Sequence, residues 1–442
     1  CGWKICGVSD ITNLRTAASF DKANVLLSSK NEGIRVLRGG NISTYKIDFR
    51  VDDIFIPTAI VNPSIYVQQY DIITPAVTSL ENIGKMARVH TKPTSNYTVG
   101  GFVYLLTPLF YNNTFSKFLL YQFTSTWFIR QLQAIAKKSG AAFYNINKTK
   151  FNELPVFIPP LAEQARIVNR VEELFTQIDA IEQNQADIDT LYDEFRKRTL
   201  TLAIQGKLVP QDSNDEPASV LLERIRAEKK AKLGKKFVDS YIYKGDDNCY
   251  YEKVGTNEPA RLDNLPFDIP DSWCWIRLEN AVIINPRNDL PDNLEVSFVE
   301  MKAIADGYNN HFSAATRPWK EVKSGFTHFQ NGDVGFAKIT PCFQNRKSVV
   351  FSSLQNEYGA GTTELHILRP IRRTILPKYL LCFVKSPYLI EHGKQKFSGT
   401  AGQQRFGTDE VKKTLFPLPP LVEQDRIVKR AEIILEKLKD ED

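Results

Sequence analysis

The stretch 159–205 constrains the fold most, because after its opening pair of prolines it contains no glycine or proline. Apolar side chains recur along it in alternating steps of four and three residues, which is the spacing of a heptad seam. Gln185 and Thr199 are polar interruptions of that seam. A helix of this length would extend for roughly 66 Å at 1.5 Å per residue. The sequence therefore predicts a long helix whose apolar face needs a partner helix.

The opening of this stretch occurs a second time near the end of the chain. Residues 419–432 read PPLVEQDRIVKRAE, and residues 159–172 read PPLAEQARIVNRVE, so 10 of 14 positions are identical. Helical periodicity does not require the shared Pro, Gln and Arg positions, and the match indicates an internal repeat. The seam residues that we predict to face a partner are Ile167, Val171, Leu174, Ile178, Ile181, Ile188, Phe195, Ile427, Ile434 and Leu438.

The rest of the chain also follows one plan twice. Residues 1–158 contain short β-rich runs, then a predicted helix over 115–138 with Thr114 as its N-cap, then a polar and basic loop. Residues 265–418 repeat this order, with a predicted helix over 377–393. We therefore predict an α+β fold of two similar mixed α/β domains at 1–158 and 265–418. The long helix would span 159–206, and 419–442 would begin a second such helix.

The predicted connector, 207–264, holds a short amphipathic helix over 217–230. Five lysines follow within 229–236. A solvated linker face and a dedicated DNA-binding strip both fit this run, and the first reading is preferred.

Composition excludes several classes of protein. The net charge of +6 and pI of 8.8 are mildly basic, unlike a protein that wraps nucleic acid unaided. Six scattered cysteines without a CxxC pair predict free thiols in a reducing cytoplasm and no zinc site. No apolar run approaches 18 residues, so we predict no membrane span. The first residues resemble neither a signal peptide nor a natural start, which suggests that the chain begins inside a longer product.

Motifs for catalysis are missing from the sequence. It contains no GxxxxGK[ST] phosphate loop, no [DN]PP[YF] segment, no GxSxG elbow and no HExxH. Asp333, Glu364 and Lys338 could be read as a nuclease site, but their order and spacing do not fit one. We predict no catalytic residue and no metal site in this chain, and hence a binding or assembly protein.

Several motifs in combination resemble the specificity subunit of type I restriction-modification systems. They are the repeated PPLxEQxRIVxR segment, the run AIQGKLVPQ at 203–211, and YYEK at 250–253 followed by PFDIPDSW at 266–273. The resemblance covers essentially the whole chain. It implies two target-recognition domains held apart by two long helices that pair antiparallel as a spacer. Each domain would read one half of a split double-stranded DNA target.

The same resemblance implies partners and cofactors. Two adenine methyltransferase subunits would use S-adenosylmethionine, and ATP-driven restriction subunits would use ATP and Mg²⁺. This chain would bind no cofactor and would work in the cytoplasm of a bacterium or archaeon. The chain departs from the family at both ends, since the second helix could cover only half of the first.

Polar loops with aromatic neighbours suit phosphate anchoring and base-edge contacts. A purely structural polar loop is the alternative for each residue. The candidate DNA-binding residues are Lys138, Ser139, Asn145, Asn147 and Lys148 in the first domain, and Arg346, Lys347, Ser398, Thr400, Gln403, Gln404 and Arg405 in the second. Two other functions stay open at this point: a stand-alone DNA-modifying enzyme with an unrecognised active site, and a coiled-coil scaffold without a role on DNA.

Overall fold

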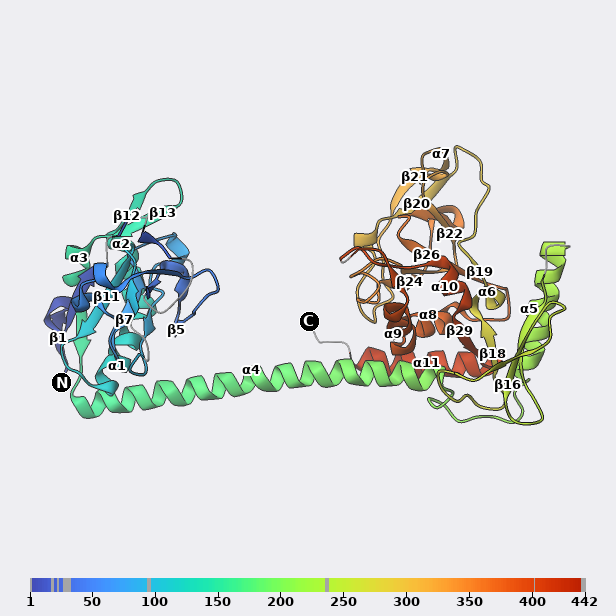
Figure 1. The fold of residues 1–442 in the computed structure, drawn as a ribbon, viewed down its shortest axis with the longest axis horizontal. Coiled ribbons are helices and arrows are strands. Elements are labelled where there is room, and N and C mark those ends of the chain that lie inside the picture. Colours follow the sequence, from blue (N-terminus) through green and yellow to red (C-terminus); the bar gives the residue numbers. More distant parts are fainter. Residues whose placement is uncertain are drawn as a thin grey trace. The chain divides into compact units, whose positions relative to one another are not determined.

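The computed structural model describes residues 2–16, 20–21, 24–26, 33–93, 97–234, 238–400 and 402–438. The chain divides into two compact units, residues 1–184 and 185–442, with the dividing point inside the long helix (Figure 1). Each unit has its own apolar core. In the part of the chain that the structure describes, no helix is long and apolar enough to cross a membrane.

A four-stranded antiparallel sheet forms the centre of each unit. Its order in unit 1 is β2-β11-β7-β9, and in unit 2 it is β19-β26-β23-β24. The strands are β2 (Thr12–Thr16), β11 (Val103–Pro108), β7 (Ile72–Pro75), β9 (Ala87–Arg88), β19 (Val282–Ile284), β26 (Leu365–Pro370), β23 (Val334–Ala337) and β24 (Ser348–Val350). Most residues of β11 and β26 are buried, because helices or the second sheet cover both faces.

The second sheet also repeats, with one addition. In unit 1 the order is β10-β3-β6, where β10 runs parallel to β3, and in unit 2 it is β21-β20-β25-β22, where β20 runs parallel to β25. The strands are β10 (Tyr97–Val99), β3 (Gly33–Leu37), β6 (Ile54–Pro57), β21 (Ala315–Pro318), β20 (Glu295–Val299), β25 (Tyr358–Gly361) and β22 (Thr327–Gln330). A bridge between Tyr66 and Thr98 occupies the place of β22 in unit 1. The prediction of two similar mixed domains is confirmed.

Two consecutive helices follow the central sheet in each unit, where the sequence predicted one. They are α1 (Asn113–Phe123) and α2 (Thr126–Ile135) in unit 1, and α8 (Pro377–Lys385) and α9 (Pro387–Gln395) in unit 2. Ser125 and Ser386 break the two helical stretches, and each hydroxyl accepts a hydrogen bond from a backbone N–H three residues later. The N-cap of α1 is Asn112 rather than the predicted Thr114.

The repeated PPL segment has the same structural role in both units. It joins β14 (Pro155–Ile158), paired with β1 (Lys4–Gly7), to α4 (Leu161–Ile204), and it joins β29 (Leu415–Leu418), paired with β18 (Cys274–Arg277), to α11 (Leu421–Lys437). Gln164 donates to the carbonyl of Pro159 at 2.8 Å, and Gln424 donates to the carbonyl of Pro419 at 3.1 Å. Both glutamines are buried. Helical periodicity did not explain this shared glutamine, and the matching bond does.

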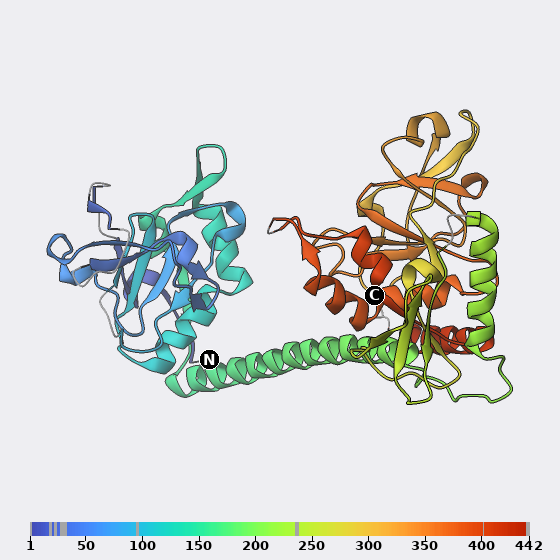
Figure 2. The ribbon, with the colours of Figure 1, turned by 45° about the vertical axis from the view of Figure 1, so that its right-hand side comes forward.

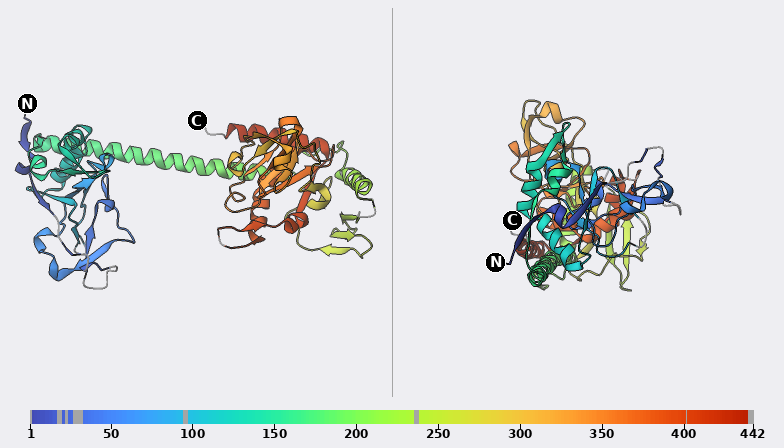
Figure 3. Two further views of the ribbon diagram at one scale, coloured as in Figure 1. Left: turned by 90° about the horizontal axis from the view of Figure 1, so that it is seen from above. Right: turned by 90° about the vertical axis from the view of Figure 1, so that its left-hand side faces the viewer.

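In unit 2, α11 packs antiparallel against the C-terminal end of α4 (Figures 1 and 3). Ile427 and Val428 of α11 share a buried core with Ile204 of α4, whereas Leu438, at the other end of α11, accepts a hydrogen bond from Arg196. The antiparallel pairing implied by the resemblance is confirmed for this part of the two helices.

The predicted seam of α4 lies mostly at the surface. Ile167 and Val171 are half-buried in unit 1, and Ile427 is fully buried in unit 2, where Ile434 and Leu438 are half-buried. The exposed seam residues are Leu174, Ile178, Ile181, Ile188 and Phe195. Phe195 is exposed, whereas Leu200, Ala203 and Ile204 are buried and share the apolar core or the pocket that α11 residues also line.

The predicted connector contains more structure than its sequence indicated. Its helix, α5 (Ala218–Leu233), is confirmed, and a three-stranded sheet follows, formed by β15 (Ser240–Lys244), β16 (Tyr250–Val254) and β17 (Ala260–Leu262). Glu252 of β16 accepts two hydrogen bonds from Arg277 of β18, so the connector is fastened to the second domain (Figure 2). Of the predicted lysine run, Lys235 and Lys236 lie outside the described residues.

Candidate nucleic-acid interface

A β-hairpin projects from unit 1 directly after α2 (Figure 2). Its strands are β12 (Ala136–Ser139) and β13 (Phe143–Ile146), joined through Gly140 at φ +80°. The base of the hairpin is anchored, because Ile146 is fully buried and β13 pairs with β8 (Val77–Thr78). The tip is exposed, including more than half of the Phe143 side chain.

The hairpin brings together three of the residues predicted to bind DNA in the first domain. Lys138, Ser139 and Asn145 are exposed on it, and Lys148 is exposed at the start of the short helix α3 (Lys148–Asn152). Lys137 was missing from the predicted set because the sequence placed it at the end of a helix. Lys137 lies directly across from Asn145 in the hairpin, and side chains of residues paired in this way lie on the same face of the sheet.

Asn147 has a structural role instead. Its side-chain oxygen accepts a hydrogen bond of 3.0 Å from the backbone N–H of Lys150 and caps α3. Asparagine is one of the residues preferred at the N-cap, the position directly before the first residue of a helix. Asn147 therefore has a structural role as the cap of α3, and its contact with DNA stays a prediction.

The equivalent hairpin of unit 2 follows α9 and consists of β27 (Phe397–Ser398) and β28 (Arg405–Phe406). Its connection contains Gly399 and Gly402, both at positive φ. Ser398, Thr400 and Gln403 are exposed and Gln404 is half-buried. Within the described ranges, the side chains of these four residues have no hydrogen-bond partner in the protein, so their donors and acceptors are available to a ligand.

Arg405 is not available in the same way. Its Nε and Nη2 donate to both carboxylate oxygens of Glu364 at 2.8–3.2 Å, and its Nη1 donates to the carbonyl of Gln403. In a bidentate Arg–carboxylate pair, the carboxylate occupies the guanidinium N–H groups that would otherwise bind guanine. Arg405 would have to leave Glu364 before it could read a base, and its base contact stays a prediction.

Arg346 and Lys347 are also bound within the protein. Arg346 donates from Nε to the carbonyl of Lys385 at 3.1 Å and places its guanidinium 5.0 Å from the centre of the Tyr308 ring. Lys347 donates to the carbonyl of Ile304 at 2.7 Å and is 14% exposed. The sequence could not indicate these partners, which lie about 40 residues away. Both residues therefore have a role in holding loops together, and their contact with DNA stays a prediction.

The imagined nuclease triad does not assemble. The Asp333 carboxylate is buried and bound by Arg369, whereas Glu364 binds Arg405. Asp71 occupies the place of Asp333 in unit 1, accepting from the backbone of Gln68 as Asp333 does from Gln330. Over the residues that the structure describes, no group of three or more His, Cys, Asp or Glu side chains could hold a metal ion.

Comparison with known proteins agrees with this architecture. Residues 2–190 match the family described as the type I restriction modification DNA specificity domain. The EcoAI specificity subunit of a type I restriction enzyme from Escherichia coli is 42% identical over 241 residues, which are 54% of this chain and 38% of that protein. The EcoKI specificity subunit from Escherichia coli strain K12 is 23% identical over 435 residues, covering 98% of this chain and 82% of that protein. The chain therefore resembles type I specificity subunits, through the matched domain at residues 2–190 and over 98% of its length in the comparison with the EcoKI subunit.

A solved structure supports the same fold for this chain. The HsdS subunit from Thermoanaerobacter tengcongensis superposes with a TM-score of 0.51 at 16% identity, over 99% of this chain and 90% of that one. The match with the EcoAI specificity subunit spans less than two fifths of that protein's length.

A buried histidine anchors the second hairpin. His366 of β26 is 1% exposed, and its Nε2 lies 2.8 Å from the carbonyl of Phe406, to which it donates. Burial lowers the pKa of His366 to about 4, although the Phe406 carbonyl favours the protonated ring. His366 is therefore neutral at pH 7 with its proton on Nε2, and the hairpin base depends on that form.

We expect unit 2 to lose stability as the pH falls, because the folded-state pKa of His366 lies below its unfolded value. The stability from neutral His366 is present above about pH 6.5 and is lost progressively toward pH 4. The loss between pH 7 and pH 5 should be roughly 2 kcal/mol from this residue. Urea unfolding followed by tryptophan fluorescence at both pH values measures it. His366→Gln, which keeps a donor but does not titrate there, should show a smaller loss, and an equal loss in both proteins would contradict the assignment.

Proposed function

We propose that this chain recognises a specific bipartite DNA sequence as the specificity subunit of a type I restriction-modification complex. The observation that carries the proposal is the repeat of one fold, in which each copy projects a polar hairpin from the same place after the same pair of helices. The hairpins differ in their side chains, with Lys and Asn in unit 1 and Ser, Thr and Gln in unit 2. One scaffold with two different polar loops suits the reading of two different half-sites.

The exposed apolar stretch of α4 supports a role in assembly. Side chains from 176 to 191 are all exposed, and they include Ile178, Ile181, Ile188 and Leu191. An apolar helix face of this kind favours burial against another protein chain. The proposed partners are two adenine methyltransferase subunits, which would carry S-adenosylmethionine, and restriction subunits, which would use ATP and Mg²⁺. Catalysis would belong to those partners.

Methylation mapping tests the proposal most directly. DNA from cells that contain this gene should carry methylated adenine in a split sequence motif, and deletion of the gene should remove that motif alone. Purified protein without partners should neither methylate nor cut DNA. Turnover by the lone chain would instead favour a stand-alone enzyme, and the lack of any salt-dependent DNA binding with methyltransferase present would favour a scaffold.

Gln404→Ala should relax sequence preference at one half-site and leave the other unchanged. The Gln404 side chain is half-exposed beside the hairpin tip, while its backbone carbonyl accepts from Thr340 at 3.0 Å, so truncation leaves the fold in place. A bidentate amide contact with adenine discriminates by about 1–3 kcal/mol. Methylation rates on duplexes with each base substituted measure the effect, with Gln355→Ala as a matched control. Equal weakening on all sequences would mark Gln404 as a backbone contact.

A further inference from the structure

In each unit, one tyrosine in a loop that joins two strands of the second sheet contacts the long helix α4. In unit 1 this residue is Tyr45, in the turn between β4 (Ile42–Ser43) and β5 (Lys46–Ile47), at φ +70°. Its ring centre lies 5.1 Å from that of Phe175 on α4, and its hydroxyl lies 3.1 Å from that of Thr124. The backbone N–H of Tyr45 donates to Met86, so the turn is fixed to the central sheet at the same time.

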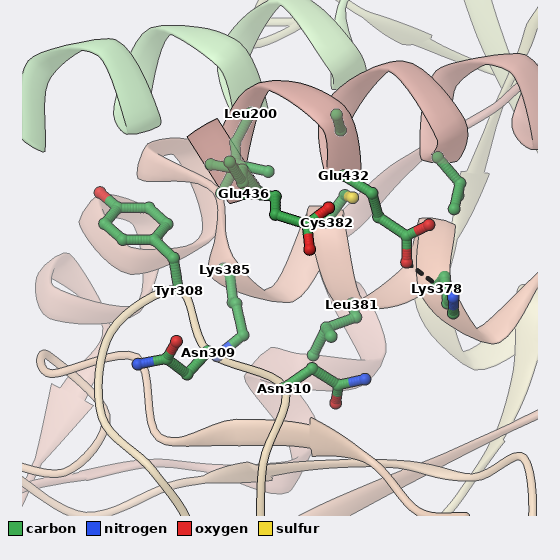
Figure 4. A pocket seen from close by; sticks show the side chains of 13 residues that line it. Leu200, Tyr308, Asn309, Asn310, Lys378, Leu381, Cys382, Lys385, Glu432 and Glu436 are labelled. Carbon is green, nitrogen blue, oxygen red and sulfur yellow. Dashed lines mark ion pairs between the residues drawn. The ribbon is translucent and has the colours of Figure 1, made fainter. Parts of the chain in front are cut away.

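Tyr308 has the corresponding place in unit 2. Its hydroxyl donates to Asp193 Oδ1 of α4 at 3.0 Å, and Asp193 also pairs with Lys197 at 2.6 Å. Figure 4 shows Tyr308 at the edge of a pocket that Leu200 of α4 and Lys385 of α8 also line. This loop of the domain is therefore tied to the helix by a directional bond to a charged acceptor.

A buried lysine connects the Tyr308 loop to a second loop. Lys385 is 3% exposed and donates from Nζ to the carbonyls of Gly307 at 2.7 Å and Arg346 at 3.0 Å. The N–H of Gly307 donates to the carbonyl of Asn345 at 2.8 Å, and the Arg346 guanidinium lies over the Tyr308 ring. A displacement of Tyr308 on α4 would thus be passed to the loop 341–347.

That second loop lies beside the candidate DNA-binding hairpin. Phe343 packs its ring against those of Phe397 and Phe406, at 5.4 and 5.5 Å between centres. Gln344 and Asn345 follow in the chain and are exposed. Their amides can bond base edges in the same way as that of Gln403.

We propose that Tyr45 and Tyr308 are positioning residues that fix each recognition domain on a spacer helix, and that Tyr308 thereby sets where the Gln344–Asn345 loop meets DNA. This inference rests on the proposed function for its consequence, which is selectivity for the length of the gap between half-sites. The bond between Tyr308 and Asp193 is a domain-to-helix contact, and its loss should let the domain shift on the helix.

The test compares Tyr308→Phe and Asp193→Ala, each of which removes one partner of the Tyr308–Asp193 hydrogen bond, with the wild-type chain. Tyr243→Phe is the control, because that tyrosine is partly exposed and packs on Tyr251 without a hydroxyl bond among the described residues. Hydrogen exchange of the isolated protein should become about tenfold faster at the amides of 305–310 and 343–347 in both variants, because each variant loses one charge-assisted hydrogen bond. Exchange at these amides should stay unchanged in the control. Unchanged exchange in Tyr308→Phe would overturn the proposal.

The second arm uses the complex with methyltransferase and duplexes whose gap is natural, one base pair shorter or one longer. The preference of the wild type for the natural gap should fall about tenfold in Tyr308→Phe. An equal decrease at every gap length would show a merely structural role and overturn the positioning role. If the wild-type complex methylates no duplex, the proposed function fails, and the exchange experiment alone then decides whether the tyrosine contact holds the two loops.

Discussion

Arg369→Met should destabilise unit 2 by about 3–5 kcal/mol, the usual effect of removing one partner from a buried ion pair. Arg369 donates three hydrogen bonds of 2.8–3.1 Å to the Asp333 carboxylate, and Asp333 is 1% exposed at the start of the central strand β23. Methionine keeps most of the side-chain volume but leaves this carboxylate without a cation. Urea unfolding, followed by the fluorescence of the buried Trp273, Trp275 and Trp319, measures the loss.

The pH and a second substitution separate charge from packing in this experiment. Burial raises the pKa of Asp333, and losing Arg369 should raise it further, so the variant should recover stability as the pH falls and Asp333 is protonated. Adding Asp333→Asn to Arg369→Met should also recover stability at neutral pH. Lys323→Met is the matched control, since its pair with Asp292 is exposed and contributes about 1 kcal/mol or less. A loss below that of the control would contradict a structural role for the buried pair.

Reversing both lysines of the first hairpin, Lys137→Glu with Lys138→Glu, should weaken DNA binding by roughly 100-fold at moderate salt. Both lysines are exposed on β12 next to Ser139, with Lys137 opposite Asn145 and Lys138 opposite Tyr144, so the reversal removes two positive charges from the hairpin proposed to bind DNA. Because each phosphate contact releases about one counterion, the slope of log affinity against log salt should fall by about two. Fluorescence anisotropy of the complex with methyltransferase over a salt series measures both quantities.

A control for net charge accompanies this prediction. Lys244→Glu with Lys253→Glu makes the same charge change on β15 and β16 of the connector sheet, which are not strands of either hairpin. Long-range electrostatics alone should then change affinity only a few-fold and leave the salt slope nearly unaltered. Equal losses in the two double variants would show that Lys137 and Lys138 act through overall charge and not through contacts.

Features that depend on local sequence were predicted well. The proline pair, the glycine- and proline-free stretch and the apolar spacing placed the long helix and the second PPL helix, which the structure shows at Leu161–Ile204 and Leu421–Lys437. The repeated order of runs likewise indicated two copies of one domain. Helix capping and periodicity act over a few residues, and a single sequence records them directly.

The prediction of secondary structure was wrong where one local sequence pattern is compatible with two different backbone conformations. The apolar residues of 115–138 continue through a break at Ser125, so α2 and the following strand were read as one helix, and Lys137 was lost from the predicted site. A serine is common both within and before helices, and its role as an N-cap depends on the geometry of its backbone.

The sequence by itself determined that this chain is a duplicated domain on a long helix with polar, basic loops. Only the tertiary structure decided which of those polar residues are available. Arg346, Lys347 and Arg405 have the composition of a DNA contact, but their partners Lys385, Ile304 and Glu364 come from distant segments. A charged side chain is free or bound according to what the fold brings within about 3 Å of it, and that distance is not a property of neighbouring residues in the chain.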